Sequence, residues 1–285
     1  MGEKGDRALV TGASSGIGRE TAIKLAERGF QVIAAGRRID RLEALAAQYE
    51  HITPMQVDLS ASEEVRSLCE HLSALEEPIS VLINNAGYSL RGALEDVSLE
   101  AARRIFEVNF FSLMRVTQAC LPGMRSLRKG TIVNLSSIVG KFTFPMGGVY
   151  AATKHAVEAI SDALRMEVRP FGIREVTIRP GVIATEFNEV ANQLTGDLMA
   201  RTDPDYKPLY QGAGAAVGKM FAGMSIPGPE IVASIILEAV RSDTPKPTYV
   251  AGPLCEDMLG PRARLDDEAF DRFISEKTGL WGIKA

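Results

Sequence analysis

Tyr150 and Lys154 are the residues whose types and spacing most directly suggest chemistry. They stand four positions apart in a stretch with a helical pattern, so the phenol and the ammonium should project from one helix face. Because many helices carry a Tyr and a Lys at this spacing, the pair alone is weak evidence. Ser137 ends a strand-like run thirteen positions upstream, and Asn109 lies earlier, in a long helical stretch. A phenol beside an ammonium group can move a proton at a carbon–oxygen group, and the roles of Ser137 and Asn109 depend on a family resemblance described below.

The reaction that suits this set is hydride addition to a carbonyl carbon. Hydride addition leaves negative charge on the oxygen, which a proton donor must neutralise. A free phenol titrates near ~10, and nearby positive charge favours its ionised form. We therefore expect Lys154 to lower the pKa of Tyr150, and Ser137 to orient the same oxygen by a hydrogen bond. His155 points off this face, which indicates an ordinary structural or surface role.

A glycine-rich loop runs from Thr11 to Gly18, between a strand-like run and a helix. Gly12 permits a sharp turn, Gly16 lets the backbone approach a pyrophosphate, and Gly18 lets the helix pack closely on the sheet. A helix that begins here offers free N–H groups to phosphates. The loop therefore predicts a dinucleotide site, with Ser14, Ser15 and Ile17 beside the three glycines.

Two arginines, Arg37 and Arg38, follow the second strand where a carboxylate would otherwise bind a free ribose 2′-hydroxyl. Guanidinium groups bind phosphate through charge-assisted hydrogen bonds. The pair predicts a 2′-phosphate, and hence NADP(H). For Arg38, both a contact with this phosphate and a merely solvated position stay open.

Short β-branched runs alternate with longer helical patterns, which indicates a parallel sheet covered by helices on both faces. Pro54 lacks the N–H of a central strand, so its strand should lie at a sheet edge. The expected strands are 8–11, 30–35, 52–57, 79–83, 131–135, 175–178 and 248–251, and the expected helices are 17–28, 39–49, one with Ser62 as its N-cap, 99–124, 149–168 and 231–241.

Two later stretches break this alternation. Residues 186–229 predict a substrate lid or a small helical insertion, with a mobile surface loop as the other possibility. Residues 253–285 form a tail without a recognisable motif.

Composition excludes several classes of function. The net charge of −4 and the absence of a basic stripe argue against nucleic acid as a partner. Cys69, Cys120 and Cys255 lie too far apart to indicate a disulfide framework or a metal site, so no metal is expected. The best apolar helix, 231–240, is too short for a membrane span, and the charged N-terminus does not resemble a secretory signal. We expect a cytoplasmic protein.

The Thr-Gly start and Gly-x-x-x-Gly-x-Gly spacing of the loop resemble the short-chain dehydrogenase/reductase family. The resemblance implies a catalytic tetrad at Asn109, Ser137, Tyr150 and Lys154, in which Ser137 rather than Ser136 is catalytic and Asn109 holds a water that relays protons to Lys154. It implies cofactor contacts from Gly12, Ser14, Ser15, Gly16, Ile17, Gly18, Arg37, Arg38, Asp58, Leu59, Asn85, Ala86, Gly87, Tyr150, Lys154, Pro180, Gly181, Ile183 and Thr185. Asn84, beside them, is expected to be structural.

The resemblance further implies one domain over 1–285, with a doubly wound (Rossmann) parallel α/β sheet of about seven strands. It predicts an NADPH-dependent oxidoreductase that reduces a ketone or aldehyde, or oxidises the alcohol. Members of the family that act on steroids or retinoids look similar around Tyr150. A homodimer or homotetramer is expected, with 99–124 and 150–168 as candidate interface helices.

An apolar substrate pocket is suggested by large side chains in the lid and after Ser137. They are Met199, Tyr206, Tyr210, Met220, Phe221 and Met224, with Phe142, Phe144 and Met146. Two other functions were weighed. A non-catalytic NADP(H)-binding regulatory protein could have the same fold, and an epimerase or dehydratase of the extended family is disfavoured by the glycine spacing and the lack of a longer C-terminal substrate domain.

Overall fold

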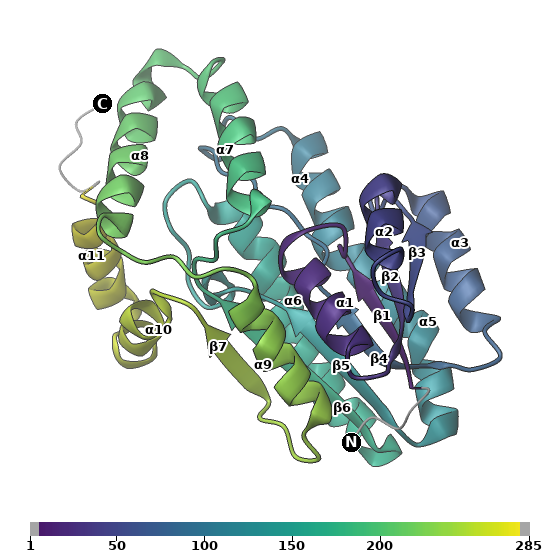
Figure 1. The fold of residues 1–285 in the computed structure, drawn as a ribbon. Coiled ribbons are helices and arrows are strands. Elements are labelled where there is room, and N and C mark those ends of the chain that lie inside the picture. Colours follow the sequence, from purple (N-terminus) through teal and green to yellow (C-terminus); the bar gives the residue numbers. More distant parts are fainter. Residues whose placement is uncertain (1–5, 280–285) are drawn as a thin grey trace.

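The computed structural model describes residues 6–279. Seven parallel strands pair in the order β3-β2-β1-β4-β5-β6-β7 (Figure 1). The strands are β1 (Arg7–Thr11), β2 (Gln31–Gly36), β3 (Ile52–Gln56), β4 (Ile79–Asn84), β5 (Gly130–Leu135), β6 (Ile173–Pro180) and β7 (Thr248–Ala251). The predicted doubly wound sheet is confirmed. Pro54 lies in β3 at one edge of this sheet, as its missing N–H predicts.

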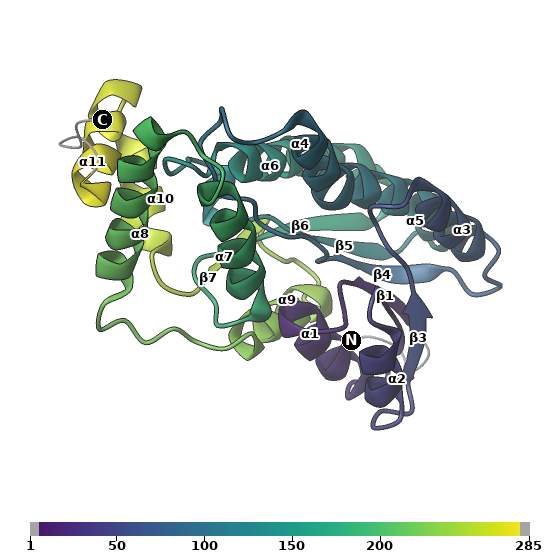
Figure 2. The same cartoon turned by 90° about the horizontal axis from the view of Figure 1, so that it is seen from above.

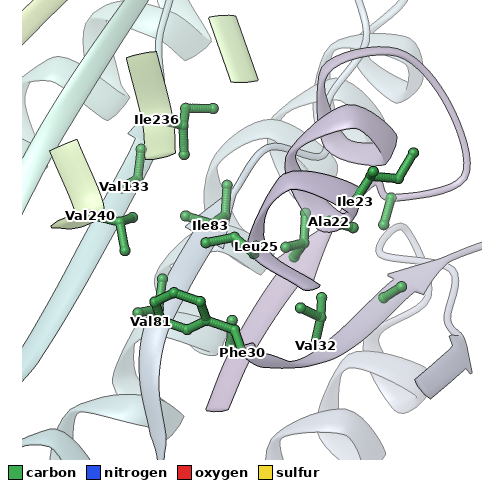
Figure 3. Close-up of a cluster of buried hydrophobic side chains, with 14 of the residues drawn as sticks. Ala22, Ile23, Leu25, Phe30, Val32, Val81, Ile83, Val133, Ile236 and Val240 are labelled. Atoms are coloured by element: carbon green, nitrogen blue, oxygen red, sulfur yellow. The ribbon is translucent and has the colours of Figure 1, made fainter. Parts of the chain in front are cut away.

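Helices cover both faces of the sheet (Figure 2). On one face lie α1 (Gly16–Ala26), α2 (Ile39–Ala46) and α9 (Glu230–Arg241), and on the other lie α3 (Ser62–Ser73), α4 (Leu99–Phe106), α5 (Ser112–Leu127) and α6 (Gly148–Val168). Each face buries its own hydrophobic core. Figure 3 shows part of the first, in which Leu25 of α1 and Ile236 of α9 pack with Ile83 of β4. Burial on both faces explains why the central strands are nearly continuous apolar runs.

One expected helix is divided in the structure, and one expected N-cap was wrong although its helix begins where it was expected. The stretch 99–124 is not one regular α-helix, because a π-helical turn at Glu107–Phe111 separates α4 from α5. This wider turn contains Asn109, which is buried. Ser62 is the first residue of α3 rather than its N-cap, which is Ala61. The Asp58 carboxylate accepts hydrogen bonds from Ser60, and that turn brings the chain into the helix one residue early.

The insertion and the tail are helical where the structure describes them. Residues 186–229 contain α7 (Glu186–Met199) and α8 (Lys207–Phe221), and the tail contains α10 (Cys255–Arg264) and α11 (Asp267–Thr278). All four follow β6 or β7, and they gather at one end of the sheet (Figure 2).

A buried polar network ties three neighbouring strands to α6. Asn84 of β4 donates to Asn134 Oδ1 of β5 over 2.9 Å, so the expectation of a structural Asn84 is met. Asn134 in turn donates to Glu175 of β6 over 3.3 Å, and Arg165 of α6 reaches the other Glu175 oxygen at 2.9 Å. Burial raises the pKa of Glu175 to about 7, although the Arg165 charge opposes this. Ionised Glu175 is therefore a cost to the folded state.

We predict that Glu175→Gln becomes more stable relative to the wild type as pH rises from about 4.5 to 7.5. Below its ordinary pKa of 4.5 the carboxyl is protonated in both states. Between 4.5 and 7 the folded state keeps a proton that the unfolded state has lost, so the wild type loses stability on the order of 1–3 kcal/mol. Urea unfolding across this range measures the difference. Glu100→Gln, an exposed site in α4, should give a pH-independent difference. A Glu175→Gln difference that stays flat, or falls, would show that Arg165 keeps the carboxylate ionised in the fold.

Candidate active site

The predicted site residues lie where parallel strands end. Thr11 ends β1, Asn84 ends β4, Leu135 ends β5 and Pro180 ends β6. These four strands are neighbours in the sheet, so the loops that leave them share one edge. Ligands of doubly wound sheets bind at the carboxyl edge, where the strand order reverses, here between β1 and β4.

The glycine loop has the backbone that its sequence predicts. Gly12 and Gly16 have positive φ angles of 68° and 54°, which glycine adopts without a steric penalty. A Cβ on Gly18 would lie 2.4 Å from both Gly12 O and Asn85 Nδ2. Only glycine permits this close contact between α1 and the loops.

Hydrogen bonds hold the loop after β4 against the glycine loop. The Thr11 hydroxyl accepts from the backbone N–H groups of Asn85 and Ala86 at 3.0 and 3.1 Å. The Asn85 amide donates to Thr11 O at 2.9 Å. Asn85 thus fixes the loop geometry, while Gly87 continues toward the Tyr150 and Lys154 side of the edge, where its Cα lies near Asn109 and Lys154.

A cavity of about 370 Å³ lies at the glycine loop. It is lined by Ser14, Ser15, Gly16, Arg19, Glu20, Arg41, Ala44, Leu45, Gln48 and Glu186. The first turn of α1 carries no acidic residue, so the positive end of the helix dipole is not neutralised there. Missing Cβ atoms, free helix N–H groups and arginines at the rim fit the phosphates of a dinucleotide.

The two predicted arginines diverge from the end of β2. Arg37 is exposed, and its charge acts on Asp58. Arg38 points to the glycine loop, where its Nη2 donates to Ser15 Oγ at 2.7 Å and its Nε to Ser14 Oγ at 3.3 Å. Arg38 is therefore tied to the predicted phosphate site rather than merely solvated.

Sequence reasoning missed Arg41 and Glu186. The Glu186 carboxylate, at the start of α7, accepts one hydrogen bond from Arg38 and one from Arg41, each 2.6 Å long. These hydrogen bonds hold the pKa of Glu186 down at about 2. Glu186 is 148 residues from Arg38, so no local pattern links them. The sequence did offer one signal for Arg41. It stands one helical turn after Arg37 and Arg38, so its side chain can lie on the same side as theirs.

Asp58 and Leu59 follow β3 on the far side of β2. Burial favours the neutral form of Asp58, but hydrogen bonds from Ser60 and the charges of Arg37 and Arg104 outweigh it and lower the pKa. Leu59 is buried. Asp58 is thus an ionised acceptor near Arg37, at the edge where the resemblance implies the adenine.

The tetrad residues come together at the ends of β5 and α6. Tyr150 and Lys154 share one face of α6, with Lys154 Nζ 5.9 Å from the centre of the Tyr150 ring. The Ser137 hydroxyl acts on the Tyr150 phenol and lowers its pKa. The neighbouring Ser136 is buried and acts instead on the Glu158 carboxyl, whose pKa it lowers.

The pKa of Tyr150 differs from expectation. Burial raises it to about 12, and the Ser137 hydrogen bond and the Arg91 charge only partly offset this. The expectation that Lys154 brings it below the free value is wrong for the protein alone, because desolvation is the larger effect. Burial also lowers the pKa of Lys154 to about 8, against the opposing charge of Glu158.

Asn109 and Lys154 are both held by protein groups. Lys154 Nζ donates to Leu135 O at 2.7 Å. The Asn109 amide donates to Tyr88 O and to Thr153 Oγ1, and its oxygen accepts from Tyr88 N. These bonds join the loop after β4 to the helix that bears Tyr150. They give the Asn109 side chain a positioning role, and the predicted water relay stays a prediction.

The turn after β6 contacts both β7 and the glycine loop. Pro180 ends β6, Gly181 N donates to Ala251 O of β7 at 2.7 Å, and Ile183 is buried. Thr185 precedes α7, and its Cγ2 would lie 3.2 Å from a Cβ on Gly16. The first residues of the lid therefore touch the glycine loop.

Comparison with known proteins agrees with this geometry. A family model described as short chain dehydrogenase matches residues 6–195. Human retinol dehydrogenase 8 is 34% identical over 250 residues, covering 83% of this chain and 78% of that protein. The crystal structure of a short-chain dehydrogenase from Streptomyces avermitilis is 29% identical, with a TM-score of 0.80 over 99% of this chain and 100% of that one. A closed serine dehydrogenase complexed with NADP⁺ is 26% identical, with a TM-score of 0.73 over 87% and 95%.

The chain belongs to the short-chain dehydrogenase/reductase family. It is an oxidoreductase of a family that uses nicotinamide cofactors. Among residues 6–279, no helix is long and apolar enough to cross a membrane. The same residues contain no cluster of His, Cys, Asp and Glu side chains suited to a metal ion.

The apolar residues expected to line a substrate pocket in this dehydrogenase/reductase are largely occupied elsewhere. Phe142 and Phe144 pack with α10 and α11, as do Met220, Phe221 and Met224 at the end of α8. The Tyr210 and Tyr206 hydroxyls donate to Asp96 and Glu95, both at 2.7 Å, and so attach the 186–229 insertion to the loop before α4. These side chains stabilise the insertion and the tail, and a hydrophobic substrate stays a prediction.

We predict that Gly181→Ala destabilises this dehydrogenase/reductase by about 1–3 kcal/mol and weakens cofactor binding. The new Cβ would lie 2.0 Å from Pro253 O, so the turn after β6 must separate from the tail. Thermal unfolding and NADPH titration measure the two effects. Gly196→Ala in α7 is the matched control, because nothing lies within 4 Å of its Cβ. Equal stability of the two variants would contradict this account of the turn.

Proposed function

We propose that this protein is an NADP(H)-dependent enzyme that reduces a ketone or aldehyde, or oxidises the corresponding alcohol. The observation that carries the proposal is the Tyr150 phenol, on which the Ser137 hydroxyl acts and which adjoins Lys154, at the same sheet edge as the arginine-rimmed glycine loop. Proton donor and dinucleotide site thus adjoin, as hydride transfer to a carbonyl requires.

The glycine loop with Ser14 and Ser15 would hold the pyrophosphate, and Arg37 with Arg38 would bind the 2′-phosphate. No carboxylate follows β2 at the position that would bind a free 2′-hydroxyl, which supports NADP(H) over NAD(H). The serine dehydrogenase relative in complex with NADP⁺ also supports this choice. Asp58 and Leu59 would border the adenine, and Asn85, Ala86 and Gly87 its ribose. Ile183 and Thr185 would hold the carboxamide, in the turn begun by Pro180 and Gly181.

Tyr150 would act as the acid in the direction of reduction. When bound, the reduced nicotinamide supplies a hydride to the carbonyl carbon. The Tyr150 phenol then gives its proton to the carbonyl oxygen, which Ser137 orients by a hydrogen bond. With a pKa near 12, the phenol is fully protonated at neutral pH and ready to donate. Lys154, mostly charged at neutral pH, would stabilise the phenolate left behind and bind the ribose hydroxyls.

The alternative is a non-catalytic NADP(H)-binding regulatory protein of the same fold. Such a protein has no need to keep a proton donor, an orienting hydroxyl and a lysine in contact. Tyr150, Ser137 and Lys154 are all present and close together here, which favours the enzyme.

We also propose a cytoplasmic homodimer or homotetramer that uses α4, α5 and α6 as its interface. Leu99 of α4 and Met166 of α6 are each 72% exposed, and Phe111 is 40% exposed. Large apolar side chains exposed on adjoining helices are typical of protein interfaces. Cys69, Cys120 and Cys255 are free thiols, as expected in a reducing compartment.

We predict that Tyr150→Phe binds NADPH as the wild type does but turns over about 10² to 10⁴ times more slowly. The substitution removes only the proton donor. Titration of NADPH fluorescence gives binding, and absorbance of reduced nicotinamide gives the rate with ketones and aldehydes. Tyr249→Phe in β7, whose hydroxyl contacts only the nearby backbone of Lys246 among described residues, should keep the wild-type rate. A wild-type rate in Tyr150→Phe would refute the assignment.

We predict that Arg37→Asp shifts preference from NADPH toward NADH by about 10- to 100-fold. The change removes one phosphate ligand and introduces a carboxylate that repels the phosphate and binds a free hydroxyl. The ratio of kcat/KM for the two cofactors measures it. Arg28→Asp, an exposed control after α1 at the opposite end of the sheet, should leave the ratio unchanged. If Arg37→Asp also leaves it unchanged, the phosphate is bound without Arg37.

A further inference from the structure

Arg91 is a partly buried cation beside the proposed proton donor, and the proposed mechanism does not use it. It lies in the loop between β4 and α4, three residues after Tyr88. Burial lowers the pKa of Arg91, and its charge in turn opposes the rise of the Tyr150 pKa. Arg91 therefore lies close enough to the phenol to act on it.

Arg91 has no anionic partner among residues 6–279. Its Nη2 donates to Asn188 Oδ1 over 3.3 Å and its Nη1 to Asn192 Oδ1 over 3.5 Å, both neutral amides of α7 at long distances. Two other partly buried arginines are neutralised: Arg165 pairs with Glu175 and Arg179 with Glu158. An unpaired buried charge is costly, and substrate sites are where such a cost is retained.

The nearest acidic side chains of the loop are already engaged. Asp96 accepts from Tyr210 and Thr202 at 2.7 and 2.6 Å, and Glu95 accepts from Tyr206. Tyr150 is the charge-bearing group that acts on the Arg91 pKa. The guanidinium thus contacts the amides of α7 and acts on the phenol, and no carboxylate among residues 6–279 forms an ion pair with it.

The backbone around Arg91 is fixed. Its carbonyl accepts from Thr195 Oγ1 of α7 at 3.2 Å, and the next residue, Gly92, donates its N–H to Met146 O at 2.8 Å. The loop is therefore attached both to the lid and to the segment before α6. The cation is held at the site rather than on a mobile surface.

Apolar groups surround the same phenol. The Phe187 ring of α7 lies 5.8 Å from the Tyr150 ring, and Leu90 and Leu194 pack in the same cluster. A ligand at Tyr150 would therefore meet hydrocarbon on one side and the Arg91 guanidinium on another.

We propose that Arg91 binds a carboxylate of the substrate, so that the substrates are oxo acids with an apolar chain. This rests on the proposed function and names its substrate class. A guanidinium binds a carboxylate through two parallel, charge-assisted hydrogen bonds. A single guanidinium, with Lys154 reserved for the phenolate and the ribose in the proposed mechanism, matches a monoanion better than a phosphate dianion. Asn188 and Asn192 would keep the guanidinium plane in place.

The reaction is ordinary carbonyl reduction. NADPH is oxidised to NADP⁺, its hydride forms the new C–H bond, the π electrons of the C=O bond move to oxygen, and Tyr150 supplies the proton. The carboxylate takes no part in the bond changes and only positions the chain. Arg91 is therefore a specificity-determining residue.

The experiment compares straight-chain oxo acids of increasing length with their methyl esters, using NADPH. We expect the wild type to prefer the best acid over its ester by about 10- to 100-fold in kcat/KM, mainly through KM. Arg91→Gln should abolish this preference and keep turnover of the esters, while Arg91→Lys should retain part of it. Arg103→Gln, an exposed arginine on α4, should behave as the wild type.

Calorimetric binding of straight-chain carboxylic acids and their methyl esters gives a readout without turnover. If the acids bind more tightly than the esters and Arg91→Gln loses this difference, the carboxylate site is supported. If, in addition, no substrate is reduced, only the reductase function is refuted. Reduction of acids and esters at equal rates by the wild type overturns the proposal and leaves the reductase intact. An equal fall in kcat/KM for acids and esters in Arg91→Gln also overturns the proposal, because Arg91 would then act only on Tyr150 and not on the carboxylate.

Discussion

All seven strands run in the same direction, and this constraint determines where the chemistry can be. Parallel strands place every strand-to-helix loop of one polarity at a single edge of the sheet. Thr11, Ser137 and Pro180 come from distant parts of the sequence, yet each follows a strand that ends there. The helix that bears Tyr150 and Lys154 is packed on the same edge by hydrogen bonds to Leu135 and Asn109. The parallel direction of the strands and these few hydrogen bonds therefore bring the site residues together.

The sequence was sufficient for the sheet and for most positions in the site because both depend on local patterns. Strands read as apolar runs, Pro54 excluded a central position, and Gly12, Gly16 and Gly18 required a close turn. Features that depend on distant residues could not be predicted. The contact of Glu186 with Arg38 and Arg41, and the packing of Phe142 on α11, join segments more than a hundred residues apart.

Electrostatics were the least predictable part of the site. Tyr150 has a cationic neighbour, from which a lowered pKa was expected, yet desolvation raises it. Desolvation depends on how closely the loop after β4, α7 and β5 enclose the phenol, which spacing in a sequence does not reveal. The same enclosure isolates Arg91, whereas Glu158 lies among Arg179 and Lys141. The Glu158 charge is thus balanced by two cations, whereas the Arg91 charge beside the phenol has no ion pair among residues 6–279.

Glu186 neutralises two arginines at the entrance of the proposed dinucleotide site when no anionic ligand is bound there. Its carboxylate belongs to α7 and occupies Arg38 and Arg41 as a resident counter-ion. In the proposed function the 2′-phosphate would take the place of this carboxylate, so the charge at the entrance would stay close to balance before and after binding. Glu186 is the first residue of α7, the helix that also carries Phe187 and Asn188 near the phenol. A change at the arginines would therefore reach the Tyr150 side of the site through α7.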